Sequence, residues 1–226
     1  MEENTFRIKK TYVYASLILV ILLGGVFMYS LGARNNQAPA GTQATEMINE
    51  NPSSNSMANH HKTFQAKSNG FFEAAVGKQV PDFELQDIGG NTVKLKDYKG
   101  KNIILFFSEG SMCYPSCWNQ IAALANDQRF NNDNTVELSI VVDSQAQWQN
   151  IMQKAPQMSK SKIFFDTTRK VSSDYDVLFL ASSMHKGSYP GHTYFVIDKD
   201  GIIRYAKDDP SMAIRNNELA TELGKL

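Results

Sequence analysis

The 226-residue chain contains only two cysteines, Cys113 and Cys117, and three residues separate them. An uninterrupted apolar run, residues 103–107, precedes them and is typical of a strand buried on both faces of a sheet. After the cysteines, Ile121 and Leu124 follow helical spacing, which predicts one buried helix face. The cysteines are therefore expected in a turn that leads from a buried strand into a helix.

Pro115 indicates where this helix begins, because proline is favoured at the first helical position and keeps the preceding residue out of the α region. Cys113 then lies just before the helix, where free N–H groups and the helix macrodipole stabilise a thiolate. One helical turn brings Cys117 within the Cα separation that a disulfide tolerates. The spacing predicts a catalytic redox pair, with Cys113 as an exposed reactive thiol and Cys117 as the resolving thiol. A static disulfide is the plainer alternative.

A second apolar segment, near the N-terminus, predicts a membrane anchor. Residues 12–31 carry no charge, and at about 1.5 Å per residue they span roughly 30 Å, the thickness of a bilayer core. Basic residues precede this segment and are nearly absent just after it, so the positive-inside rule places the N-terminus in the cytoplasm. We predict a cytoplasmic segment at 1–10, a single transmembrane helix at 11–31 and an extracytoplasmic C-terminal domain at the cell membrane.

A cleaved signal peptide is the alternative, and we favour the anchor because the apolar run is longer than a usual signal-peptide core. Both interpretations place the domain outside the cytosol, where a dithiol needs a supply of electrons to stay reduced. Lys plus Arg and Asp plus Glu each number 23, so the net charge does not point to a nucleic-acid partner.

Composition and hydrophobic pattern divide the rest of the chain into a linker and a domain. Residues 32–70 are rich in Asn, Ser, Gln, Ala and Thr, which predicts a flexible linker. His60 and His61 lie in this linker. We interpret them as solvated residues, and a weak metal site is the less favoured alternative. The domain at 71–226 shows two hairpin patterns, three apolar strand patterns joined by helical patterns, and a closing amphipathic helix over 210–226 with Ile214 and Leu226 on its buried face. Strands joined through helices are parallel and hairpins are antiparallel, so we expect an α/β fold with a mixed central sheet flanked by helices.

This order of elements, with a redox turn after the first central strand, resembles the thioredoxin fold in its redoxin or AhpC/TSA (peroxiredoxin-like) form. Three segments carry the resemblance: VGKQVPDF (76–83) with LKDYKG (95–100), the stretch from FF (106–107) through Cys113 to WNQIAAL (118–124), and GHTYFVIDKDG (191–201). The resemblance implies a thioredoxin-like fold with an N-terminal β-hairpin extension. It also implies an antioxidant or disulfide oxidoreductase activity that uses a thiol electron donor and no cofactor.

Two positions depart from the peroxiredoxin pattern. That family carries Thr or Ser where this chain has Gly110, and a catalytic arginine where it has His192. Peroxide reduction needs donors of this kind, so we prefer thiol–disulfide exchange with exported protein thiols or disulfides, and keep thiol-dependent hydroperoxide reduction as the alternative. Thioredoxin-like exchangers place a cis-proline at the position of His192. We expect Pro115, His192 and Thr193 to position the cysteines.

A further alternative comes from the spacing of the cysteines, which also resembles that of SCO-type copper chaperones, membrane-anchored redoxins with a Cys-x-x-x-Cys motif and a histidine. Two thiolates and an imidazole suit copper, and His192 or His185 is the candidate third ligand. The preferred interpretation involves no metal. Glu109 is the ionisable residue beside the redox turn, and we interpret it as a solvated carboxylate.

Overall fold

The computed structural model of the chain describes residues 67–226. The expected cytoplasmic segment, the expected transmembrane helix at 11–31, and His60 and His61 lie outside the described residues. Among residues 67–226, no helix combines the length and the apolar character needed to cross a bilayer. The described part corresponds to the predicted domain at 71–226 together with the last residues assigned to the linker.

Those last linker residues contact the domain. The Ser68 hydroxyl donates a hydrogen bond to Asp176 Oδ2 at 2.9 Å, and the Asn69 side-chain amide donates one to the Ser173 carbonyl at 2.9 Å. Contacts with the domain therefore begin a few residues before position 71.

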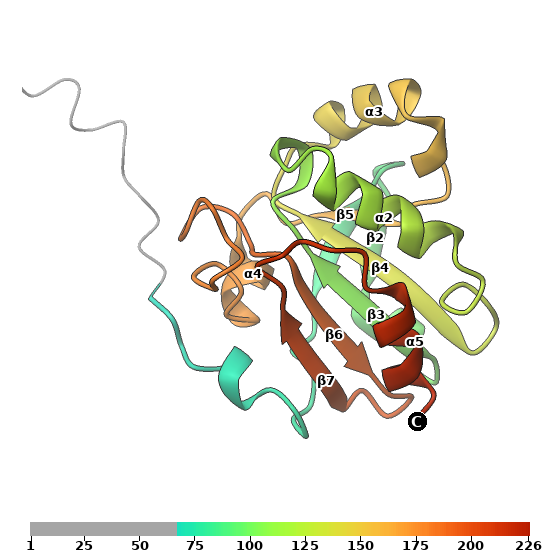
Figure 1. Cartoon of the computed structure of the whole chain (residues 1–226), viewed down its shortest axis with the longest axis vertical. Helices are drawn as coiled ribbons and strands as arrows, with labels where there is room; N and C mark the ends of the chain where they lie inside the picture. Colours follow the sequence, from blue (N-terminus) through green and yellow to red (C-terminus); the bar gives the residue numbers. More distant parts are fainter. Residues whose placement is uncertain (1–66) are drawn as a thin grey trace, which may run out of the picture. The chain divides into compact units, whose positions relative to one another are not determined.

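A mixed seven-stranded sheet runs through the domain in the order β2-β1-β5-β4-β3-β6-β7 (Figure 1). Neighbours β3 and β4, and β4 and β5, are parallel, and the other neighbouring strands are antiparallel. The strands are β1 (Glu84–Asp87), β2 (Thr92–Lys94), β3 (Asn102–Phe107), β4 (Thr135–Val141), β5 (Ile163–Phe165), β6 (Thr193–Ile197) and β7 (Ile203–Asp208). The predicted α/β fold with a mixed sheet is confirmed.

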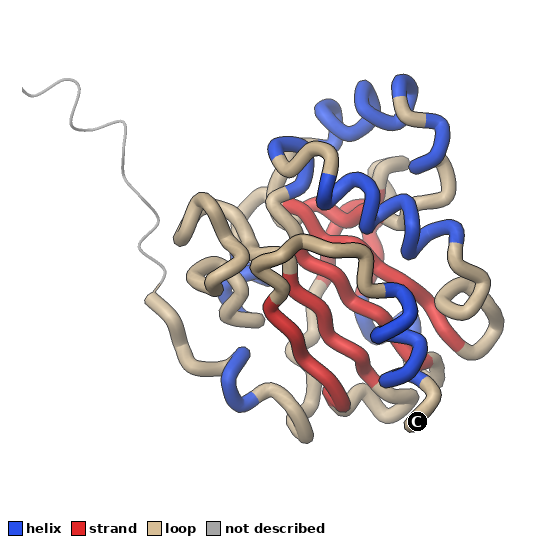
Figure 2. Tube along the Cα trace, viewed as in Figure 1, coloured by secondary structure: helices blue, strands red, loops and turns tan. Residues whose placement is uncertain are grey.

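Helices cover both faces of the sheet, and Figure 2 shows them in blue around the red strands. Helices α2 (Ser116–Asn126), α3 (Gln145–Lys154) and α5 (Asn216–Leu223) pack on one face, and α4 (Lys170–Asp174) packs on the other. Short 3₁₀ helices lie in the connections: η1 (Phe72–Ala74), η2 (Leu95–Tyr98), η3 (Gly110–Met112) and η4 (Pro156–Met158).

Strand β3 contributes to both halves of the hydrophobic core, because successive side chains of a strand point to opposite faces of the sheet. Ile104 and Phe106 pack on the side of α2, α3 and α5, whereas Leu105 and Phe107 pack on the side of α4. All of them are fully buried, as the apolar run predicted. The carboxyl end of β3 is thus a rigid starting point for the turn that carries the cysteines.

Helix α3 begins with a side-chain cap at Ser144. The Ser144 hydroxyl accepts the Gln147 backbone N–H, and the Gln147 side chain accepts the Ser144 backbone N–H. This reciprocal capping box satisfies two otherwise free N–H groups.

The closing helix is shorter than the predicted 210–226. Ile214 and Leu226, both expected on its buried face, are 58% and 47% exposed, which corrects that prediction. The physical reason is Asp209, whose carboxylate accepts backbone N–H bonds from Ser211 and Ala213 and so holds the residues before α5 in a loop. Such local side-chain bonds offer the backbone an alternative to a helix.

Glu137, in the middle of β4, carries a fully buried carboxyl group. Its Oε1 accepts the Lys162 backbone N–H at 3.4 Å, and its Oε2 accepts the Ser139 hydroxyl at 3.3 Å. Burial raises the pKa of Glu137 to about 7, and the charge of Lys162 offsets only part of that effect. The folded protein therefore keeps a proton on Glu137 at pH values where the unfolded chain, with a pKa of 4.5, has lost it.

We expect Glu137→Gln to stabilise the protein at pH 8 by up to roughly 3 kcal/mol, because the folded state then contains no buried group to ionise. The stability contributed by neutral Glu137 is complete below pH 4.5 and is lost as the pH rises through about 7, so the variant gains little at pH 5. Urea unfolding of both proteins at the two pH values measures the difference. Glu84→Gln, at an exposed carboxylate of β1, is the control and changes stability by less than about 0.5 kcal/mol. Equal gains from both variants would contradict an effect of burial.

Candidate active site

Cys113 and Cys117 form a disulfide at the carboxyl end of β3, with an S–S distance of 2.13 Å and a Cα–Cα distance of 5.3 Å. Cys113 follows η3, and Cys117 lies in the first turn of α2. The Cys113 carbonyl accepts the Cys117 N–H at 2.9 Å, so the two residues are one helical turn apart. Pro115, expected at the first helical position, is instead the N-cap residue, and α2 begins one residue later at Ser116.

The cysteines are buried, contrary to the expectation of an exposed Cys113. Cys113 is 4% exposed and Cys117 is fully buried, while the neighbouring Met112 and Tyr114 point into solvent. Part of the cover comes from Met212, whose thioether sulfur lies 3.8 Å from Cys113 Sγ. Cys113 is still the more accessible residue of the pair, so we take its sulfur as the one that a reactant meets first.

Asp143, which follows β4, holds the turn before the cysteines. Its carboxylate accepts hydrogen bonds from the Ser111 backbone N–H at 2.8 Å, the Ser111 hydroxyl at 2.7 Å and the Trp148 indole N–H at 2.8 Å. Gly110 makes room for it: the residue has φ +66°, and a Cβ at this position would overlap Asp143 Oδ2. Glycine therefore stands at the position where the resemblance expects Thr or Ser, because a carboxylate from β4 fills that space.

His192, the residue before β6, contacts the resolving cysteine. Its Nδ1 lies 3.5 Å from Cys117 Sγ, and its Nε2 lies 2.8 Å from the Tyr194 hydroxyl. Since the Tyr194 hydroxyl donates its proton to the Ala213 carbonyl, it accepts the Nε2–H of His192, and the lone pair of Nδ1 faces the sulfur. Burial lowers the pKa of His192 to about 4, so the imidazole is neutral near pH 7.

Glu109 is buried, which corrects its interpretation as a solvated carboxylate. It accepts backbone N–H bonds from Met184 at 2.5 Å and His185 at 3.0 Å, and its Oε2 lies 3.1 Å from His185 Nδ1. These contacts hold the 184–185 segment beside the redox turn. They also occupy one of the two ring nitrogens of His185, Nδ1.

Of the residues expected to position the cysteines, His192 and Pro115 lie beside the pair. Thr193 pairs with Phe107 in the sheet, and its buried hydroxyl makes no hydrogen bond within residues 67–226. Sequence reasoning missed Asp143 and Met212 as parts of the site. A polar residue directly after a buried strand was the available signal for Asp143, whereas Met212 had none.

The two cysteines and His192 are also the group that could hold a metal ion. The Sγ atoms and a ring nitrogen of His192 all lie within 4.8 Å of one another. His185 does not belong to this group. Of the two candidate third ligands, the structure therefore brings only His192 to the cysteines.

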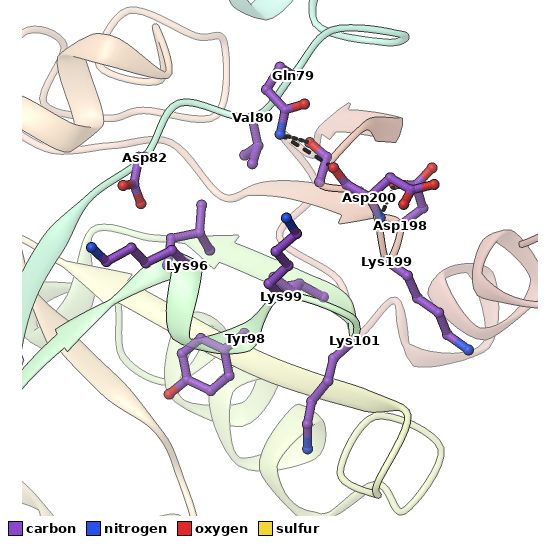
Figure 3. A pocket seen from close by; sticks show the side chains of 13 residues that line it. Gln79, Val80, Asp82, Lys96, Tyr98, Lys99, Lys101, Asp198, Lys199 and Asp200 are labelled. Atoms are coloured by element: carbon purple, nitrogen blue, oxygen red, sulfur yellow. Dashed lines mark hydrogen bonds between the residues drawn. The ribbon is translucent and has the colours of Figure 1, made fainter.

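A pocket of about 390 Å³ lies at the opposite end of β3, between its first residues and the β6–β7 turn (Figure 3). Its lining includes Lys96, Lys99, Lys101 and Lys199, and in this view the side chains of Lys101 and Lys199 extend away from Gln79. The lining contains no cysteine or histidine, so this pocket is separate from the redox site.

Comparison with known proteins places this site in a family. The model of the AhpC/TSA family matches residues 76–206. The chain belongs to the AhpC/TSA family. Its similarity to this family supports a thiol-based oxidoreductase activity, and the cysteine chemistry of the family requires no cofactor.

Individual relatives agree with this assignment. The chain is 33% identical to the mitochondrial thioredoxin-dependent peroxide reductase of Drosophila melanogaster over 57% of this chain and 56% of that protein. It is 36% identical to peroxiredoxin-2 of Bos taurus, over 58% and 68% of the two chains, and 33% identical to peroxiredoxin Bcp of Bacillus subtilis, over 56% and 80%. The alignment thus spans little more than half of the fly protein.

Solved structures show the same fold. The reduced 2-Cys peroxiredoxin of Plasmodium vivax superposes with a TM-score of 0.58 at 22% identity, covering 67% of this chain and 95% of that one. Peroxidoxin BcpB of Mycobacterium tuberculosis gives a TM-score of 0.56 at 20% identity, covering 67% and 97%. The predicted thioredoxin-like fold in its peroxiredoxin form is confirmed.

We expect Gly110→Ala to lower the free energy of unfolding by about 1–3 kcal/mol more than Gly100→Ala does. Both glycines have positive φ, but a Cβ at Gly100 meets nothing within 4 Å, whereas one at Gly110 overlaps the Asp143 carboxylate. Gly100→Ala therefore reports the cost of the left-handed backbone alone, about 1–2 kcal/mol. Thermal and urea unfolding measure both. Similar losses in the two variants would show that Asp143 does not need this space.

We expect ¹⁵N NMR of His192 to show the neutral Nε2–H tautomer at pH 6, with protonation centred near pH 4, because burial lowers its pKa. Between the ordinary pKa of 6.5 and about 4 the unfolded chain binds the extra proton, so this residue reduces stability as the pH falls through that range. Protonation near pH 6.5 would instead identify a solvated imidazole that does not face Cys117.

Proposed function

We propose that this chain is a membrane-anchored, extracytoplasmic thiol–disulfide oxidoreductase whose Cys113–Cys117 pair exchanges with other exported proteins. The observation that supports it most directly is the pair itself, a disulfide with a neutral imidazole lone pair facing its inner sulfur. The membrane location rests on the uncharged segment at 12–31.

The exchange follows from the unequal exposure of the sulfurs. In the reduced protein the Cys113 thiolate attacks a disulfide of the partner, which forms a mixed disulfide and releases one partner thiolate. Cys117 then attacks Cys113 Sγ and forms the intramolecular disulfide. The second partner thiolate leaves and takes up the proton of Cys117. Two electrons pass to the partner, and a donor dithiol returns the pair to the reduced state. His192 Nδ1 accepts the Cys117 S–H and orients it for the second step.

The surface around the disulfide supports a protein as the reactant. Large apolar side chains are exposed on the segments that frame the pair: Met112, Tyr114, Met184 and Ile214. We call these four residues the apolar rim. Exposed apolar side chains of this kind are a feature of protein interaction sites. A small hydroperoxide does not need such a surface to reach the cysteine.

Hydroperoxide reduction is the second candidate, and the names of the relatives favour it. In that reaction the Cys113 thiolate takes one peroxide oxygen as a sulfenic acid and releases an alcohol or water. Cys117 then displaces water to give the disulfide. The Ser111 hydroxyl, two residues before Cys113, is already engaged, because it donates to Asp143 Oδ1 at 2.7 Å. This occupancy favours disulfide exchange over peroxide reduction.

We expect Cys117→Ser to accumulate mixed disulfides with exported proteins in intact cells, because the intermediate on Cys113 is then not resolved. Non-reducing gels followed by mass spectrometry of the trapped adducts measure this. Cys113→Ser is the matched control and traps none.

The same two variants separate the two candidates. Rapid hydroperoxide consumption by the reduced wild type that disappears in Cys113→Ser, together with no trapped protein in Cys117→Ser, would make the chain a peroxidase. Trapped proteins with slow peroxide consumption would identify an exchanger.

A further inference from the structure

Four soft donor groups meet at the disulfide. The sulfurs of Cys113 and Cys117 and a ring nitrogen of His192 lie within 4.8 Å of one another, and Met212 Sδ lies 3.8 Å from Cys113 Sγ. They come from the turn into α2, the residue before β6 and the loop after β7, segments far apart in sequence. Two thiols, one imidazole and one thioether are the types of ligand that soft metal ions prefer.

His192 is oriented for a metal. The Tyr194 hydroxyl takes the Nε2–H, which fixes the tautomer and leaves the Nδ1 lone pair toward Cys117 Sγ at 3.5 Å. Proteins orient metal-binding histidines in this way, through a hydrogen bond on the nitrogen that does not bind the ion. Phe106, whose ring centroid lies 4.7 Å from that of His192, restrains the imidazole further.

Met212 is placed by a strained backbone. Its φ is +48°, in the left-handed region that L-residues with a Cβ rarely adopt. Asp209 stabilises this conformation through its own carbonyl, which accepts the Met212 N–H at 2.9 Å, and through its carboxylate, which binds Arg215. The Arg215 backbone N–H in turn donates to Gln120 of α2 at 2.8 Å. The loop that presents the thioether is thus tied to the helix that carries Cys117.

We propose that the reduced protein binds one Cu(I) ion through Cys113, Cys117 and His192, with Met212 as the fourth ligand. Reduction of the disulfide by a dithiol supplies two electrons and two protons, and metal binding then releases the two thiol protons. Thiolate and thioether ligands select Cu(I) over harder cations. The oxidised protein lacks both thiolates, so it binds no copper. The proposal requires only that the disulfide can be reduced, whichever partner reacts with it.

The test is an anaerobic titration of the reduced full chain, purified in detergent, with Cu(I) against a competing chelator. We expect one ion per chain, no binding by the oxidised protein, and loss of the site in Cys113→Ser. Met212→Leu keeps the apolar bulk but removes the sulfur, and it weakens binding at least about tenfold, as changes around metal sites do. Met152→Leu, at a partly buried methionine of α3, is the matched control and leaves the affinity unchanged.

X-ray absorption of the copper complex gives a readout that does not depend on affinity. Three sulfurs and one nitrogen around copper in the wild type, and one sulfur fewer in Met212→Leu, support the site. The same ligand count in both proteins would remove Met212 from it. Affinity no higher than that of a reduced peptide containing the Cys-x-x-x-Cys segment, or tighter binding of Zn²⁺ than of Cu(I), would overturn the proposal. Trapping of mixed disulfides by Cys117→Ser would stand in either case, so failure of the metal site is distinct from failure of the exchange reaction.

Discussion

Buried carboxylates that follow the core strands determine where the loops of this domain lie. Glu109 follows β3, Asp143 follows β4, Asp166 follows β5 and Asp209 follows β7, and all are nearly inaccessible to solvent. These strands run in the same direction, since β3, β4 and β5 are mutually parallel and β6 is antiparallel to both β3 and β7. The carboxylates therefore lie along the same side of the sheet, at the carboxyl ends of these strands, where the disulfide also lies.

A buried carboxylate is costly unless hydrogen bonds compensate it, so each of these groups has to be met by N–H donors from a nearby loop. Asp143 takes its donors from the redox turn, Glu109 from the 184–185 segment, and Asp209 from the loop that carries Met212. Burial by itself raises the pKa of Asp209, but the hydrogen bonds from Arg215 and Ser211 outweigh burial and hold the pKa below its usual range. The positions of the loops around the sulfurs thus follow from the need to satisfy buried charge.

The sequence predicted the features that depend on short-range pattern. The apolar run of β3 and the one-turn separation of the cysteines are each determined by neighbours within a helical turn or two, and each is where it was expected. The predicted start of the closing helix was wrong because one aspartate, Asp209, accepts the backbone N–H groups of the predicted first turn. The burial of Cys113 and Glu109 and the approach of Met212 depend on contacts between residues about 75 to 99 positions apart, which no local pattern reveals.

The same long-range ties couple the two chemistries proposed for the disulfide. Met212 Sδ lies 3.8 Å from Cys113 Sγ, where both a partner thiol and a metal ion would have to be accommodated, and the loop of Met212 is bonded through Gln120 to the helix that carries Cys117. A copper ion held by both thiolates would use the electron pairs that disulfide exchange needs. The two occupants therefore exclude each other, and the redox state of the pair controls both together: the disulfide form binds neither copper nor an oxidised partner, whereas the dithiol form is competent for either one.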